Sequence, residues 1–184
     1  MRKIVYSINV SIDGCCDHTK MVPTEGMLEF FADLLLQADM LVYGRITYQL
    51  MVPYWPDVAK NGSPSKAELN FARAFDTTKK LVFSRTMRSV DDKNSLIARG
   101  DLEAEILKLK KEVGKDILVG GVDLPSQLTA LGLIDEYLFV INPVIAGKGR
   151  RLFEDLSLPE KLGLTLVRTE SLESGHVALR YVRP

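Results

Sequence analysis

The chain has 184 residues and a mass of 20.6 kDa, which favours a single domain over residues 1–184. Its 24 basic residues are balanced by 24 acidic ones, so the broad positive field that attracts a nucleic-acid backbone is absent. No apolar stretch is long enough for a secretory signal or a membrane span, and we therefore expect a cytoplasmic protein that binds neither nucleic acid nor membrane.

The first half of the chain alternates strand-like and helical segments. Residues 3–10 are rich in Ile, Val and Tyr and predict a strand. Thr24 is placed to cap a helix that runs to about Gln37. The apolar run 40–43 stops at Gly44 and predicts a buried strand, and a short helix is expected after it.

The middle of the chain is less regular. Residues 52–64 contain three prolines and predict a loop inside the domain. Ser65 and Glu68 form a capping box before a helix that ends near Phe75. Strands are predicted at 80–84 and, more weakly, at 95–98.

The remaining segments complete an α/β pattern. A helix capped by Asp101, a buried strand at 117–119, a helix at 124–131 and a strand at 136–141 follow in order. Two strands at 164–169 and 176–182 then form a hairpin. In the last strand Val177, Leu179 and Tyr181 alternate with His176, Ala178 and Arg180, and we expect the first set to be the buried one. The pattern predicts a mixed, mostly parallel sheet with an antiparallel C-terminal hairpin.

Three polar turns follow predicted strands and are candidates for one binding site. They are Gly120-Gly121, Gly44-Arg45 with Thr47, and Ser84-Arg85-Thr86. Glycine lets an anion approach the backbone, and arginine offers a planar fork to a phosphate. Ligands of open α/β sheets bind at the carboxyl ends of the strands, so the three turns together indicate an anionic ligand with more than one phosphate. Taken singly, each is also compatible with an ordinary turn, and the fingerprint G-x-G-x-x-G is absent.

Other residues are candidates for contacts with a substrate. The loop with Lys148 and Arg150 could hold a substrate phosphate, or be a solvated turn or an oligomer contact. Asp13 ends the first strand and could assist proton transfer, or be a turn aspartate. Glu29 is expected either to face the cleft or to be exposed. Cys15 and Cys16 are adjacent, and since a disulfide between neighbours is strained, we expect two reduced thiols and no metal site.

Five motifs occur in order along the whole chain: SINVSIDG (7–14), LVYGRITY (41–48), LVGG (118–121), GLIDE (132–136) and NPVIAGKG (142–149). This ordered set resembles the dihydrofolate reductase-like superfamily, in the branch that includes the reductase domain of the bacterial bifunctional deaminase-reductase of riboflavin biosynthesis. The resemblance implies a mixed sheet of about eight strands, NADPH bound across its carboxyl edge, and a homodimer.

The resemblance also implies roles for particular residues. Arg45 and Thr47 would lie near the cofactor phosphates, and Ser84, Arg85 and Thr86 near the adenosine 2′-phosphate. Gly120, Gly121 and Val122 would contact the pyrophosphate, so that a bulky residue at Gly121 would block the cofactor without unfolding the chain. The first strand would lie along the nicotinamide, with Val10 on the cofactor and Asn9 on the substrate.

The implied function is an NADPH-dependent reductase of a small molecule, similar to 5-amino-6-(5-phosphoribosylamino)uracil reductase. Dihydrofolate is a less favoured substrate because the position of the expected acid falls near apolar Leu28. The alternative is a non-catalytic module that binds a nucleotide. Turnover of NADPH would distinguish the two.

Overall fold

A computed structural model describes all of the residues, Met1–Pro184. The strands are β1 (Ile4–Ser11), β2 (Ala38–Gly44), β3 (Lys79–Phe83), β4 (Ser95–Ala98), β5 (Asp116–Val119), β6 (Glu136–Asn142), β7 (Thr165–Ser171) and β8 (Val177–Val182). The helices are a 3₁₀ turn, His18–Lys20, and α1 (Glu25–Gln37), α2 (Arg45–Met51), α3 (Trp55–Asn61), α4 (Lys66–Thr77), α5 (Leu102–Lys111) and α6 (Asp123–Ala130). None of the helices has the length and apolar character that a bilayer crossing demands.

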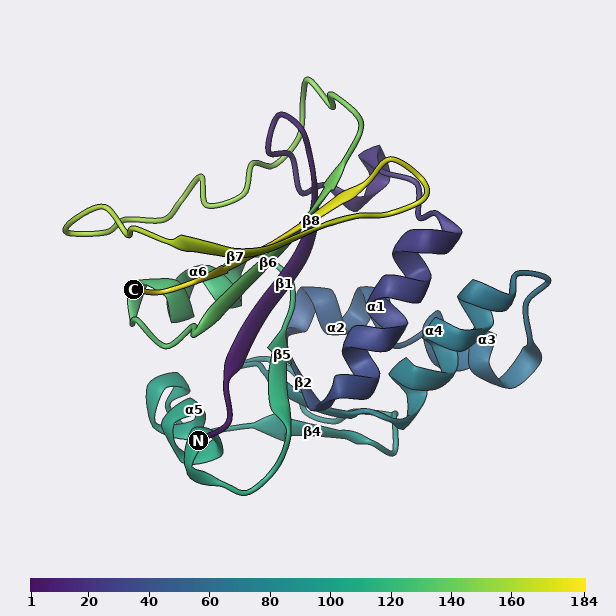
Figure 1. Ribbon diagram of the computed structural model, residues 1–184. Helices are drawn as coiled ribbons and strands as arrows, with labels where there is room; N and C mark the ends of the chain where they lie inside the picture. Colours follow the sequence, from purple (N-terminus) through teal and green to yellow (C-terminus); the bar gives the residue numbers. More distant parts are fainter.

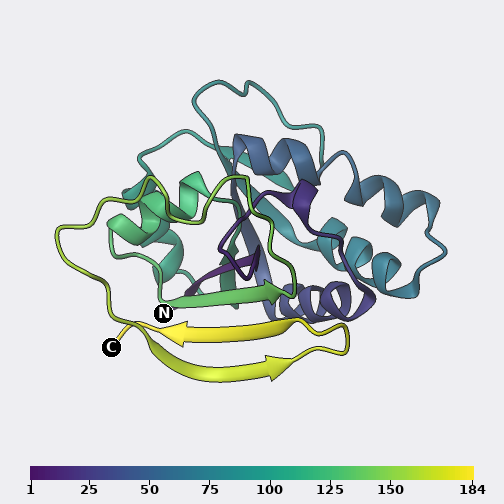
Figure 2. The ribbon, with the colours of Figure 1, turned by 90° about the horizontal axis from the view of Figure 1, so that it is seen from above.

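The strands form one sheet in the order β4-β3-β2-β5-β1-β6-β8-β7. Every neighbouring pair from β4 to β6 is parallel, and only the β6–β8 and β8–β7 pairs are antiparallel. Figure 2 shows this edge, where the green strand β6 is followed by the two yellow strands of the hairpin. The predicted mixed sheet with an antiparallel C-terminal hairpin is therefore correct.

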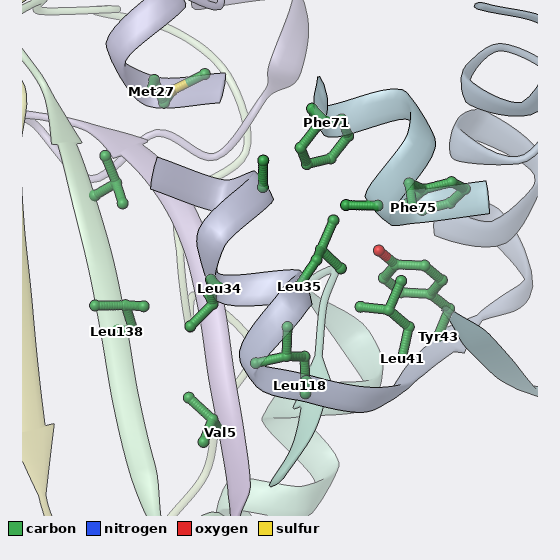
Figure 3. Packing of buried hydrophobic residues seen from close by; sticks show 14 of the residues in the cluster. Val5, Met27, Leu34, Leu35, Leu41, Tyr43, Phe71, Phe75, Leu118 and Leu138 are labelled. Carbon is green, nitrogen blue, oxygen red and sulfur yellow. The ribbon is translucent and has the colours of Figure 1, made fainter. Parts of the chain in front are cut away.

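Helices cover both faces of the sheet, with α1 to α4 on one side and α5 and α6 on the other (Figure 1). The parallel strands are buried on both faces because their alternate side chains join different clusters. Val5 of β1 packs with the α1–α4 side, whereas its neighbours Ile4 and Tyr6 pack with α5 and α6. Figure 3 shows the first cluster, in which Leu34 and Leu35 of α1 face side chains of the strands.

The stretch 52–64, predicted to be a loop, contains the helix α3, and this prediction was wrong. Pro56 lies in the first turn of α3, where a missing backbone N–H costs no helical hydrogen bond. The Trp55 ring lies 4.4 Å from that of Phe71 between ring centroids, and this contact fixes α3 on α4. A tertiary contact therefore overrides the local proline signal.

The predicted burial of β8 was also reversed. Ala178 and His176 are each 3% exposed, whereas Val177, Leu179 and Tyr181 are only partly buried. Ala178 joins the α1 side of the core, where a small side chain fits under the helix. The choice of buried face depends on which side the helix covers, and alternation alone cannot show that.

His176 is buried in a chain of polar side chains. Its Nε2 lies 2.9 Å from Asn142 Oδ1, and its Nδ1 lies 2.8 Å from Ser174 Oγ. Asn142 Nδ2 donates to the carbonyl oxygen of Val10 at 3.0 Å, so Asn142 Oδ1 must accept, and Nε2 is the ring nitrogen that carries the proton. Ser174 also accepts from Thr24, the N-cap of α1, at 2.7 Å. The network ties the hairpin to α1 and to the end of β1.

Candidate functional site

A cleft of about 740 Å³ lies at the carboxyl ends of β2, β3, β4 and β5. The residues of the predicted polar turns that line it are Gly44, Arg45, Thr47, Ser84, Arg85, Gly120 and Val122. They come from all three of the predicted polar turns. The turns meet because the parallel strands that precede them end at the same edge of the sheet.

Three arginines of the cleft have no ion-pair partner. Arg45 Nη1 donates to Gln49 Oε1 at 2.9 Å, and Arg99 Nη2 donates to the backbone carbonyl of Arg88 at 3.1 Å. The side chain of Arg85 has no hydrogen-bond or ion-pair partner and is exposed. Guanidinium groups without a carboxylate partner leave a positive potential in the cleft, which favours an anionic ligand.

Arg150, predicted to contact substrate, lines this same cleft and is already paired with carboxylates. Its guanidinium lies 2.5 Å from Asp123, 3.4 Å from Glu154 and 3.5 Å from Asp155. The hydrogen bond to Asp123 raises the pKa of Arg150. Because Asp123 begins α6 inside the cleft, Arg150 neutralises a carboxylate that would repel an anion there.

The two glycines of the turn after β5, Gly120 and Gly121, are required by packing. A Cβ at Gly120 would lie 2.6 Å from Tyr43 Cε1. Gly121 has a φ of +93°, and a Cβ there would overlap Thr47 Oγ1. A bulky residue at Gly121 would therefore strain the turn and press on Thr47 of α2, so a cost in stability is expected in addition to the predicted loss of cofactor binding. Tyr6 also fixes the turn, since its hydroxyl donates to the Gly121 carbonyl at 2.9 Å.

The Asp13 carboxylate, predicted to assist proton transfer, is held by several hydrogen bonds and an ion pair. It accepts from Ser11 Oγ at 2.6 Å and from the backbone N–H groups of Ala146 and Gly147 at 3.0 Å, and it lies 2.9 Å from Arg151. The hydrogen bond from Ser11 and those from the backbone hold the pKa of Asp13 well below its usual range. The carboxylate fastens the segment after β6 to the end of β1, at the top of Figure 1.

The other predicted site residues lie outside the cleft. Val10 is 4% exposed, and Asn9 is partly buried with its amide 4.0 Å from Met21 Sδ. Thr86 and Lys148 are exposed, and so is Glu29 on α1. Gly121 packs against Thr47 in the turn but does not line the cleft. Cys15 and Cys16 are both free thiols.

Sequence reasoning missed Arg99 and Asp123 as residues of the cleft. Arg99 directly follows β4, and the rule that selected Ser84 and Arg85 after β3 applies to it equally. The register shows why the two arginines share a wall, since Phe83 pairs with Ala98 at the ends of these strands. Asp123 follows the predicted Gly120-Gly121-Val122 turn, so the same rule applies to it as well, whereas its ion pair with Arg150 could not be predicted from the sequence.

The family model of the RibD C-terminal domain matches residues 2–178, almost the whole chain. The chain belongs to the RibD C-terminal domain family. It is 36% identical to the uncharacterized protein YyaP of Bacillus subtilis over 188 aligned positions, which cover 98% of this chain and 94% of YyaP. It is 25% identical to the uncharacterized protein YwjB of the same organism, with 89% of each chain covered.

Solved structures of RibD-like proteins share the fold. A putative riboflavin biosynthesis protein from Shewanella sp. PV-4 superposes with a TM-score of 0.73 at 22% identity, covering 100% of this chain and 99% of that one. RibD from Acinetobacter baumannii superposes with a TM-score of 0.74 at 16% identity, and this chain spans 58% of it. The resemblance to the riboflavin-biosynthesis reductases and the predicted fold class are thereby confirmed.

Proposed function

We propose that this RibD-type domain is an NADPH-dependent reductase of a small molecule, with the cofactor bound in the arginine-lined cleft. The observation that carries the proposal is the set of three arginines without ion-pair partners, Arg45, Arg85 and Arg99, around one cleft at the carboxyl edge of the sheet. A solved relative from Thermotoga maritima, at 15% identity and a TM-score of 0.69, is named a deaminase and 5-amino-6-(5-phosphoribosylamino)uracil reductase. A pyrimidine that carries a ribose phosphate is accordingly the substrate that we favour.

The cleft suits the phosphates of NADPH. Arg85 and Arg99 follow the carboxyl ends of the neighbouring strands β3 and β4, so both guanidinium groups can bind the 2′-phosphate. Arg45, at the start of α2, and the backbone around Gly120 would meet the pyrophosphate. NADPH, when bound, supplies the hydride.

In the reaction, the role of the protein would be to orient the two reactants and to exclude water. The helix α1 carries Leu28 against the core, where dihydrofolate reductases have an acid, and this favours a substrate other than dihydrofolate. Since Asp13 is held ionised, we propose that a water molecule gives the proton.

The alternative is a module that binds a nucleotide without turnover. The structural commitment of Asp13 favours it, because the candidate acid of the site is already in use. Oxidation of NADPH by a panel of carbonyl and imine substrates would support the reductase. Tight NADPH binding with no turnover of any of them would support the alternative.

The cofactor assignment is tested with Arg85→Ala. We expect NADPH affinity to fall about tenfold or more, since a charge-assisted contact to the 2′-phosphate is lost, while NADH affinity changes less than about twofold. Isothermal titration calorimetry measures both, with Lys108→Ala as the control, since Lys108 is exposed on α5 and does not line the cleft. Equal losses for NADPH and NADH would refute the role of Arg85 at the 2′-phosphate. A wild-type protein that binds neither dinucleotide would refute the proposed function.

A further inference from the structure

A second and larger cavity, about 1110 Å³ in volume, lies on the α1–α4 side of the molecule. It opens to solvent and is lined by the end of α2, by α3, by the end of α4 and by the segment 87–93 that leads from β3 to β4. None of its lining residues lines the arginine cleft. The cavity is thus a separate site, although α2 and the segment after β3 run from one to the other.

Four basic side chains surround this cavity: Lys60, Arg73, Arg88 and Lys93. All four are exposed, and none has a side-chain hydrogen bond or ion pair. Of the acids, Asp92 is already paired with the buried Lys80 at 3.3 Å. Asp76 and Asp91 are left without an ion-pair partner, so positive charge exceeds negative among the free groups. Such a surplus favours an anion.

The floor of the cavity is apolar. Val52 is 9% exposed, and Met87 and Val90 pack against the core. Tyr48 lines the cavity at 5% exposure, and its buried hydroxyl has no hydrogen-bond partner. Buried polar groups are normally hydrogen-bonded, and this hydroxyl oxygen, which lies below the cavity surface, would gain a partner only if a bound molecule displaced the side chains that cover it.

We infer that this cavity binds an organic phosphate about the size of a mononucleotide. The basic side chains would take the phosphate, and the apolar floor a flat ring. Asp76 and Asp91 would accept hydrogen bonds from hydroxyl or amino groups of the same molecule. The volume is too large for a phosphate ion alone, and the mixture of charges and apolar surface fits a molecule that has all three kinds of group.

Two hydrogen bonds connect this cavity to the arginine cleft. Arg45, in the cleft, donates to Gln49, which lines the cavity. Arg99, in the cleft, donates to the backbone carbonyl of Arg88, which lines the cavity. A ligand that moves Gln49 would reposition Arg45, and one that moves the Arg88 backbone would reposition Arg99. Either movement would change NADPH affinity, a consequence that rests on the proposed function. By linkage, NADPH would change the affinity of the cavity by the same factor.

The site is tested by titrating the apoprotein with uridine monophosphate. Trp55 is the only tryptophan and precedes Pro56 of the cavity wall, so its fluorescence reports binding there. We expect saturable quenching in the wild type, an affinity at least about tenfold lower in the double variant Arg73→Ala/Arg88→Ala, and an unchanged affinity in Arg85→Ala. Inorganic phosphate at the same concentrations should produce much weaker quenching.

The titration contains no NADPH, so its outcomes test the cavity independently of the proposed function. No saturation by uridine monophosphate, or equal affinity in the wild type and the double variant, overturns the site. If the affinity for uridine monophosphate fell only in Arg85→Ala, the ligand would lie in the arginine cleft, and this result would also overturn the cavity site. Because the replaced arginines are exposed, we expect the double variant to melt at the wild-type temperature. NADPH affinity with and without saturating uridine monophosphate then tests the coupling, and equal values would overturn that part only.

Discussion

Single charged residues in this protein are distinguished by what they already bind. Asp13 and Arg150 looked like candidates for substrate chemistry, but each is held by several partners, Asp13 by Ser11 and the 146–147 backbone and Arg150 by three carboxylates. Arg85 has no partner at all and keeps its full capacity for a ligand. The free residue is the better candidate for binding, because a ligand contact there displaces no existing hydrogen bond.

Asp13 predicts a pH dependence of stability. Its pKa is lower in the folded chain than in the unfolded one, so its contribution is complete above the ordinary aspartate pKa of about 3.9 and is lost as pH falls toward the folded value. We expect the gap in unfolding free energy between the wild type and Asp13→Asn to be constant above about pH 5 and to narrow below about pH 4. Urea unfolding followed by circular dichroism at several pH values measures this gap. A gap that widens in acid would contradict the role given to Asp13.

The junctions between strands and helices carry both the packing and the candidate site. The turn after β5 is the clearest case, because Gly121 needs a positive φ and contacts Thr47 of α2. One glycine pair thus brings α2 and α6 close enough for their first turns to share a cleft. A ligand site and a tight turn, which the sequence left as alternatives, are compatible at this position.

Replacing Gly121 tests the packing of this junction. We expect Gly121→Val to lower the unfolding free energy by about 2 to 5 kcal/mol, from backbone strain together with the clash against Thr47. Gly62→Val is a matched control, since Gly62 has a φ of +89° and a Cβ there would meet nothing within 4 Å. Chemical denaturation of both variants separates strain from overlap, and equal losses would show that Thr47 is irrelevant.

The molecule as a whole has two sheet edges that differ in kind. β4 is a strand of four residues, whereas β7 has seven and is exposed along nearly its whole length. Leu166 and Val167 of β7 are 50% and 52% exposed. A long edge with apolar side chains is a template for pairing with another chain. We therefore propose that the expected homodimer forms through β7.

The homodimer is tested by sedimentation equilibrium. We expect the wild type to show twice the 20.6 kDa mass of one chain, and Val167→Lys to weaken the dimer at least about tenfold by placing charges in the contact. Leu96→Lys on β4, at a position 70% exposed, serves as the control on the other edge. A monomeric wild type, or equal weakening by both variants, would exclude pairing through β7.

Local patterns in the sequence were enough for the order along the chain of the strands and of every α-helix except α3, for the N-caps Thr24, Ser65 and Asp101, and for the three turns that meet at one edge. These features depend on neighbouring residues and on the rule that parallel strands end together. Folding in three dimensions decided the buried face of β8, the helix α3, the ion pairs of Arg150 and the hydrogen bonds of Asp13. These depend on partners far along the chain, and no local period or spacing in the sequence records such a contact.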